Sequence, residues 1–520
     1  MTRPIFSLIG LLLFITAFSP TVYQPEPIRV SGGLVSGIVN PKTGIQSFKG
    51  IPFAAPPVGN LRWKAPQPAK PWTGVRQCDA FGPSPMQGVP APFGPWSAEF
   101  LIPKAPISED CLYLNVWTGQ AGATQKKESR RPVLVWIYGG GFSSGGSGAP
   151  IYDGEATAQK GVVFVSINYR VGPFGFFAHP ELTQESGKNA SGNYGLMDQI
   201  AALQWVKQNI AAFGGDPANV TIAGQSAGSM SVNCLVASPL AKGLFTKAIA
   251  ESGASFARPQ PLLKQAEESG VAVMKAMGAS SLAELRAKSA DEVLAKAQGS
   301  VRGPITDGYV LPESIAAIFA HKKENSVALL TGWNEDEGMV FGPPKNAADY
   351  RKQVAQQQGA RADVYLQHYP GTTDDEAADS QLKGSRDQVF GVQNYRWATL
   401  QSEQGKPVYV YRFTRKLPAS GEYAHYGAFH TGEVAYAYDN LRFIDRQLRP
   451  LDGADDKLAT EMSAYWVNFI KTGNPNGGGL PQWPAYSATG KQVLILGEST
   501  HAEPLPDAAR LAFLYGLMSN

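Results

Sequence analysis

Short, almost uninterrupted runs of apolar and β-branched residues recur along the chain and predict buried β-strands. These runs lie at residues 133–138, 162–168, 219–222, 326–332, 408–413 and 493–496. Strands of this kind are typical of a parallel sheet that is covered on both faces. Between them, residues 195–213 have the apolar spacing of a helix, and residues 262–298 predict added helices. The pattern therefore predicts an α/β fold with a large, mostly parallel central sheet and helices on both faces.

The composition is that of a large globular protein. The chain has 520 residues, of which 43% are hydrophobic and 17% are charged, and its formal net charge is +3. No basic block indicates a nucleic-acid partner, and no acidic tail indicates a disordered arm. Glycine and proline are frequent in the first 100 residues, which predicts long ordered loops. Without an internal repeat or a low-complexity linker, residues 23–520 are expected to form a single domain.

The N-terminus has the pattern of a signal peptide. Arg3 supplies a positive charge ahead of the apolar core at residues 5–18, whose length is typical of such signals. The core is shorter than the roughly 20 residues that a membrane-spanning helix needs, although an uncleaved anchor is the alternative. We therefore expect residues 1–22 to be a cleaved signal peptide of a secreted or periplasmic protein. No stable membrane insertion is expected after cleavage.

Residues 224–228 (GQSAG) have the G-x-S-x-G pattern of a nucleophile elbow, a sharp turn between a strand and a helix. They follow the predicted strand at 219–222 and precede a helical segment. The glycines permit the strained backbone and the close chain approach of such a turn. Residues 141–145 (GFSSG) match the same pattern but continue into a glycine-rich stretch instead of a helix. The sequence therefore favours Ser226 over Ser143 as the nucleophile.

A serine nucleophile needs a histidine base and an orienting carboxylate, which follow it along the chain in the order acid, histidine in α/β-hydrolases. Two histidines follow the predicted strand at 408–413, namely His425 and His430, and position does not separate them. Three acids follow the strand at 326–332, namely Glu335, Asp336 and Glu337. The glycine-rich residues 139–142 follow another predicted strand and favour an oxyanion hole of backbone N–H donors.

Three segments, in order, resemble the signatures of the type-B carboxylesterases, a family of the α/β-hydrolase fold that includes the cholinesterases. Residues 48–63 resemble the N-terminal signature, residues 108–117 the second signature, and residues 214–228 the active-site signature. The similarity spans nearly the whole mature chain. It implies an α/β-hydrolase fold with long loop and helical insertions. It also implies a serine carboxylesterase that works through an acyl-enzyme intermediate, with no metal or other cofactor.

The resemblance also implies a role for particular residues. Glu337 matches the family's acid, which lies in an Asp-Glu-Gly turn, and His430 matches its histidine, because Glu433 follows three residues later. The implied donors of the oxyanion hole are Gly140, Gly141 and Ala227. Ser252 matches a serine near the acid.

Further matches concern structure. The resemblance implies a disulfide between Cys78 and Cys111 and a buried, structural ion pair between Arg62 and Glu109. Cys234 lies at an apolar position after the elbow and is expected to be a buried free thiol.

The chain departs from the relatives that hydrolyse choline esters. Those enzymes have a glutamate before the nucleophile, where this chain has Gln225, and an aromatic residue where it has Val340, followed by Phe341. A cation gains less in such a pocket. We therefore expect a small-molecule, neutral carboxylic ester as substrate. Alternatives are a non-catalytic binding protein of the same fold and a hydrolase of amides or thioesters. The oligomeric state is left open.

Overall fold

An eleven-stranded sheet forms the centre of the molecule, in the order β16-β15-β14-β13-β12-β11-β9-β10-β8-β4-β3. The computed structural model describes residues 25–119, 130–256, 260–297, 299–301, 303–338 and 344–518, so the expected signal peptide lies outside the described residues. The strands of the sheet are β3 (Ile38–Val39), β4 (Gln46–Pro52), β8 (Tyr113–Thr118), β9 (Arg131–Ile137), β10 (Val163–Ile167), β11 (Gly215–Gln225), β12 (Lys247–Glu251), β13 (Ala328–Asn334), β14 (Val408–Phe413), β15 (Gln492–Leu496) and β16 (His501–Pro504).

The interior of the sheet is parallel and its margins are antiparallel. Strands β10, β9, β11, β12, β13, β14 and β15 pair in parallel with their neighbours. Antiparallel pairs of β10 with β8, β8 with β4, and β4 with β3 form one margin, and β15 with β16 forms the other. Each of the six predicted strands lies in the parallel part, where continuous apolar runs are buried from both sides. The predicted mostly parallel sheet is confirmed.

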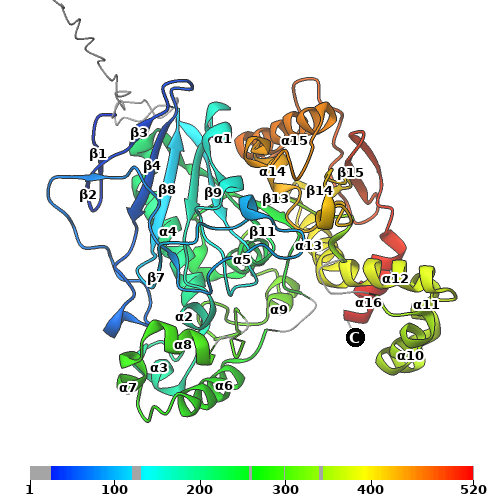
Figure 1. Cartoon of the computed structure of the whole chain (residues 1–520), viewed down its shortest axis with the longest axis horizontal. Helices are drawn as coiled ribbons and strands as arrows, with labels where there is room; N and C mark the ends of the chain where they lie inside the picture. Colours follow the sequence, from blue (N-terminus) through cyan, green and yellow to red (C-terminus); the bar gives the residue numbers. More distant parts are fainter. Residues whose placement is uncertain are drawn as a thin grey trace, which may run out of the picture.

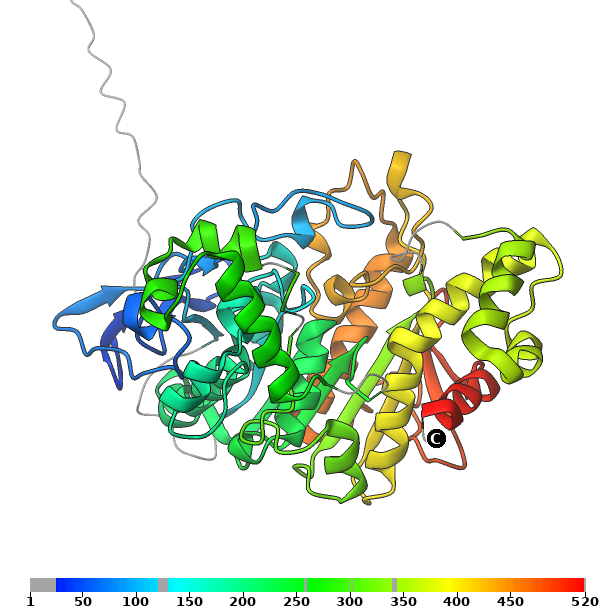
Figure 2. The same cartoon turned by 90° about the horizontal axis from the view of Figure 1, so that it is seen from below.

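Helices cover both faces of the sheet (Figures 1 and 2). One face carries α4 (Tyr194–Asn209), α5 (Ala227–Ala237) and α13 (Val392–Ser402), which pack on β11, β12, β13 and β14. The other face carries α1 (Glu155–Gln159), α14 (Val434–Ala437) and α15 (Gly453–Thr472). The helix predicted at residues 195–213 corresponds to α4 and a short 3-10 turn, Ile210–Phe213.

Two groups of helices extend beyond the central layers (Figure 1). The helices predicted at residues 262–298 form the first group, as α6 (Leu263–Ala276), α7 (Leu282–Ala287) and α8 (Ala290–Ala297). The second group contains α10 (Ala347–Gln358), α11 (Ala362–His368), α12 (Asp374–Arg386) and α16 (Ala508–Met518). A π-helical turn, η9 (Asp387–Gly391), joins α12 to α13.

The remaining elements are short and lie mainly in the N-terminal part. They are β1 (Ile28–Val30), β2 (Gly33–Ser36), β5 (Val75–Gln77), β6 (Ser84–Pro85), β7 (Ile107–Ser108), α2 (Gly172–Phe176), α3 (Pro180–Glu185) and α9 (Ile315–Ala320). Among the described helices, none combines the length and the apolar character that a bilayer-spanning helix requires.

The implied disulfide between Cys78 and Cys111 is wrong, because both residues are buried free thiols. Cys78 follows β5, where its N–H donates to the carbonyl of Ser36 and its own carbonyl accepts from Lys49. Cys111 precedes β8 and lines a small cavity with Trp63. Each thiol is held by the contacts of its own segment, and the structure has no bond between the two sulfur atoms.

Two other structural expectations are confirmed. Cys234 is a fully buried free thiol inside α5. The guanidinium of Arg62 forms two hydrogen bonds with the carboxylate of Glu109, at 2.7 and 2.5 Å, in a largely buried pair. The same guanidinium donates to the carbonyl of Lys288, so the pair connects the N-terminal loops to the segment between α7 and α8.

Candidate active site

Ser226 occupies the sharp turn between β11 and α5. Its backbone has φ 58° and ψ −123°, a conformation that is strained for a residue with a side chain. Its N–H donates to the carbonyl of Glu251 at 2.9 Å, which fixes the turn against β12. A Cβ on Gly224 would lie 2.5 Å from the backbone of Gly228, and a Cβ on Gly228 would collide with the carbonyl of Ile137. The glycines of the G-x-S-x-G pattern are therefore required by close packing.

His430 lies in the loop after β14 and contacts the acid that follows β13. Its Nδ1 atom is 2.8 Å from Oε1 of Glu337, and the Glu337 side chain is fully buried. A carboxylate at this position favours the tautomer with a proton on Nδ1, which leaves Nε2 free to accept another proton. His430 and Ser226 line the same cavity. His425 is exposed instead and packs against the ring of Tyr426.

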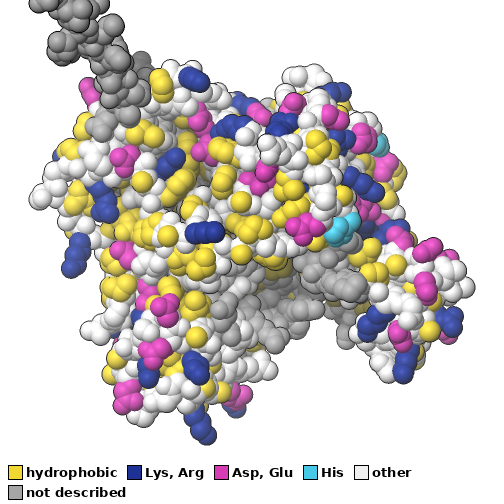
Figure 3. Space-filling model, viewed as in Figure 1, with side chains coloured by type: hydrophobic (Ala, Val, Ile, Leu, Met, Phe, Trp, Pro, Cys, Tyr) yellow, Lys and Arg dark blue, Asp and Glu magenta, His cyan; other side chains and the backbone are white. Residues whose placement is uncertain are grey.

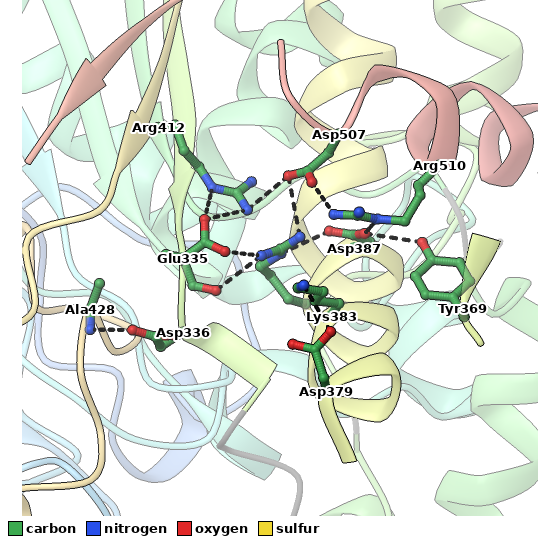
Figure 4. A network of polar contacts seen from close by, with 11 residues as sticks. Glu335, Asp336, Tyr369, Asp379, Lys383, Asp387, Arg412, Ala428, Asp507 and Arg510 are labelled. Atoms are coloured by element: carbon green, nitrogen blue, oxygen red, sulfur yellow. Dashed lines mark hydrogen bonds and ion pairs between the residues drawn. The ribbon is translucent and has the colours of Figure 1, made fainter. Parts of the chain in front are cut away.

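The three consecutive acids after β13 have different partners. Glu337 contacts His430, whereas the carboxylate of Asp336 accepts a hydrogen bond from the N–H of Ala428 at 2.8 Å. Glu335 forms ion pairs with Arg386 and Arg412, at 2.7 and 2.9 Å (Figure 4). Burial alone raises the pKa of Glu335, but the two guanidinium groups outweigh it and hold the pKa below its usual value. The geometry thus singles out one acid, Glu337, beside a histidine.

The glycine-rich loop after β9 lies against the elbow. A Cβ on Gly139 would lie 2.7 Å from the carbonyl of Gln225, so this contact also requires glycine. Gly140 and Gly141 have φ values of 122° and 62°, and both line the cavity beside Ser226. Ala227 is the first residue of α5, so its N–H has no acceptor within the helix.

Ser143, the serine of the second G-x-S-x-G match, lies in a turn of this glycine-rich loop. Its hydroxyl donates to the carbonyl of Gly140 at 3.2 Å. No helix begins at Ser143 in the described structure, which distinguishes it from Ser226. The structural context of the second match is therefore not that of an elbow.

The cavity above Ser226 has a volume of about 700 Å³. Aromatic side chains form much of its wall, namely Phe93, Trp96, Phe100, Tyr152 and Phe390. None of the described residues that line it is Asp, Glu, Lys or Arg. On one face of the molecule, hydrophobic side chains gather in a band across the middle, while charged side chains are scattered around it (Figure 3). Val340 and Phe341, which the sequence assigns to the pocket, lie outside the described residues.

Gln225, a predicted pocket residue, belongs to a chain of contacts that surrounds His430. The indole N–H of Trp96 donates to Oγ1 of Thr431 at 3.1 Å, and this hydroxyl donates to the Gln225 side-chain oxygen at 3.3 Å. The amide nitrogen of Gln225 lies 3.3 Å from each ring nitrogen of His430. The ring of Phe390 stacks on the imidazole, with 4.4 Å between centroids. These contacts restrict the orientation of the imidazole ring.

Trp96, Thr431 and Phe390 are not identified by the sequence analysis. Trp96 lies in a loop without periodic spacing, more than 300 residues from His430 in the sequence. Phe390 lies in the π-helical turn η9, a form of helix that apolar spacing does not predict. Only the packing of distant segments brings them to the cavity. Thr431 is next to His430 in the sequence, and its φ of 82° is apparent only in the structure.

Two other residues that the family resemblance singles out, Glu433 and Ser252, are buried. Glu433 is fully buried, and its carboxylate accepts a hydrogen bond from the side chain of Asn334. Burial, together with the charges of Glu251 and Glu337, raises the pKa of Glu433 well above its usual value. Ser252 is also fully buried, but in the described structure its hydroxyl has no hydrogen-bond partner and does not bond to Glu337.

Comparison with known proteins places the chain in a family. The model of the carboxylesterase family matches residues 24–514. The fumonisin B1 esterase of Sphingopyxis macrogoltabida is 38% identical over 501 residues, covering 91% of this chain and 87% of that protein. The para-nitrobenzyl esterase of Bacillus subtilis is 34% identical, covering 91% and 96%.

Other relatives agree with this assignment. A liver carboxylesterase of Sus scrofa is 34% identical, covering 96% of this chain and 94% of that protein. A solved structure of a PNB esterase superposes with a TM-score of 0.81 at 33% identity, covering 94% of this chain and 99% of that one. The chain therefore belongs to the carboxylesterase family, has the α/β-hydrolase fold, and is a carboxylic ester hydrolase.

Proposed function

We propose that the chain hydrolyses neutral carboxylic esters with Ser226 as nucleophile, His430 as general base and acid, and Glu337 as the orienting carboxylate. The observation that carries this proposal is the 2.8 Å contact between His430 and the buried Glu337, beside an elbow that presents Ser226 to the same cavity. This order of nucleophile, acid and histidine is that of the α/β-hydrolase triad.

The reaction has two halves. Nε2 of His430 accepts the hydroxyl proton of Ser226 as its oxygen attacks the ester carbonyl, and the N–H groups of Gly140, Gly141 and Ala227 stabilise the oxyanion. Glu337 stabilises the imidazolium, which then protonates the leaving alcohol. Water repeats the sequence on the acyl-enzyme, so that the carboxylic acid is released and the serine is regenerated.

The lining of the cavity supports an uncharged, apolar substrate. An ionic group in the cavity would lose hydration without a charged partner among the described lining residues. Aromatic rings instead favour apolar or aromatic ester groups, because burial contributes about 25 cal/mol for each Å² of apolar surface. The relative that is named para-nitrobenzyl esterase is consistent with a substrate of this class.

The test is a competition between butyrylcholine and its uncharged 3,3-dimethylbutyl analogue, which has nearly the same size. We expect a higher kcat/KM for the neutral ester, because the cation finds no carboxylate in the described lining to compensate for the hydration that it loses. A clear preference for the cation would contradict the neutral-substrate proposal while leaving the triad intact.

We further propose that residues 1–22 are removed on export to the periplasm or the medium, and that residues 23–520 then act as one catalytic unit. The short apolar core behind Arg3 supports this proposal. N-terminal sequencing of the enzyme recovered from the exported fraction of its host tests it. A mature chain that still begins at Met1 would contradict it.

A further inference from the structure

Asp336 joins the segment after β13 to the segment that carries His430. Its carboxylate accepts from the N–H of Ala428 at 2.8 Å, and its own N–H donates to the carbonyl of Ala428 at 3.1 Å (Figure 4). Gly427 has a φ of 61°, and a Cβ at this position would collide with the Asp336 carboxylate. The carboxylate therefore fits closely against a stretch of backbone that ends two residues before His430.

Asn334 makes a parallel connection. Its side-chain amide donates to the carbonyl of Phe429 at 2.8 Å and to the carboxylate of Glu433. Together with Glu337, these residues bond the end of β13 to the His430 segment at successive positions. Glu335 is the exception, because its carboxylate does not contact the His430 segment. It pairs instead with the guanidinium groups of Arg386 and Arg412, the second of which is labelled in Figure 4.

We propose that Asp336 is a positioning residue that holds His430 at the correct distance from Glu337. The inference rests on the proposed function of the triad. The chain between the end of β14 at Phe413 and α14 at Val434 contains no strand or α-helix, so its backbone hydrogen bonds to neighbouring segments determine where the imidazole lies. Loss of the Asp336 carboxylate removes one of the two hydrogen bonds that hold Ala428, and a displacement of about 1 Å at a catalytic group can cost on the order of 100-fold in rate.

The substitution Asp336→Ala removes the acceptor, whereas Asp336→Asn retains an oxygen that can accept from Ala428. We expect Asp336→Ala to lower kcat by roughly 10- to 100-fold with little change in KM, and Asp336→Asn to retain most of the activity. The matched control is Asp445→Ala, because Asp445 also accepts from backbone N–H groups but in an exposed turn. Equal losses in folded Ala and Asn variants would overturn the proposal.

A double-mutant cycle separates positioning from a general structural role. If Asp336 acts through the Glu337–His430 pair, Asp336→Ala should lower kcat by less than about threefold when Glu337→Gln is already present. An unchanged kcat for Asp336→Ala, or full additivity of the two losses, would overturn the positioning role alone. Normal turnover of Glu337→Gln would instead overturn the proposed triad. If Asp336→Ala does not fold, the same cycle with Asp336→Ser applies the same criteria.

Discussion

Glu335 and Glu337 lie two residues apart, yet their carboxylates point to different sides of the end of β13 and contact different partners. Glu335 pairs with Arg386 at 2.7 Å, and Glu337 lies 2.8 Å from His430. In a continued strand, residues two apart would share one face of the sheet. The strand ends at Asn334 and a turn follows, so this alternation no longer applies. The different environments of the two acids are therefore a property of the turn.

The ion-pair network around Arg386 should contribute to stability. This nearly fully buried guanidinium bonds to Glu335, Asp387 and Asp507, whose carboxylates are labelled in Figure 4, and thereby joins the end of β13, α12, η9 and the segment before α16. Arg386→Met removes a buried cation from three carboxylates and leaves only Arg412 and Arg510 to pair with them, so we expect a loss of about 3 kcal/mol in the free energy of unfolding, measured with urea. Arg446→Met is the control, because its pair with Asp456 is exposed, and a similar loss there would contradict the burial argument.

The two histidines that the sequence leaves undecided should differ sharply in activity. His430→Ala removes the imidazole that contacts Glu337, and we expect kcat to fall by a factor approaching 10⁶. His425→Ala should leave most of the turnover, because this side chain is exposed and packs on Tyr426. Steady-state kinetics on a neutral aryl ester measure both. A larger loss of kcat in His425→Ala than in His430→Ala would contradict the assignment of His430 as the base.

The three cysteines should titrate as free thiols. Burial raises the pKa of Cys78 to about 11 and that of Cys234 to about 12, and it raises the pKa of Cys111 well above its usual value. A thiol reagent at pH 8 should therefore react slowly with the native enzyme, because thiolate is the reactive form. After unfolding without a reductant, we expect three thiols per chain. A count of one thiol per chain would instead show that the protein contains a disulfide, which the structure lacks.

Glu251 should make stability depend on pH. Burial raises its pKa to about 7, and it accepts hydrogen bonds from Tyr438 and Trp466. The folded chain retains this proton up to about pH 7, whereas the unfolded chain loses it near pH 4.5, so stability falls as the pH rises between these values.

The variant Glu251→Gln keeps an oxygen acceptor and cannot ionise. Its free energy of unfolding, relative to the unmodified chain, should therefore increase by on the order of 2–3 kcal/mol from pH 4.5 to pH 7. Urea titrations of both proteins at several pH values measure this difference. A constant difference across the range would show that Glu251 does not titrate in this window.

The sequence predicts the elements whose residues are buried from both sides, and it fails where the pattern is polar. Each of the six apolar runs forms a strand, because a strand inside a parallel sheet needs apolar residues on both faces. Helices α10 to α12 were not predicted. Their residues are mainly polar, and only narrow faces pack against neighbouring helices, so apolar spacing gives little signal.

In the candidate site, too, some residues are evident from the sequence and others only from the structure. The elbow around Ser226 is local, so its glycine pattern and flanking elements are visible in the sequence, and the family resemblance distinguishes His430 from His425. Trp96 and Phe390 join the cavity through contacts between distant segments, which no local pattern encodes. The disulfide that the family resemblance implies between Cys78 and Cys111 is absent for the same reason, because such a bond depends on how two distant segments are placed relative to each other.

Covalent labelling of the nucleophile tests the central claim most directly. A fluorophosphonate probe reacts with a serine hydroxyl only where a base and an oxyanion hole activate it. Intact-mass analysis should show one label per chain, and peptide mapping should place it on Ser226, with no label on the Ser226→Ala variant. A label on Ser143, which lies in the same cavity and matches the same sequence pattern, would contradict the assignment of the elbow.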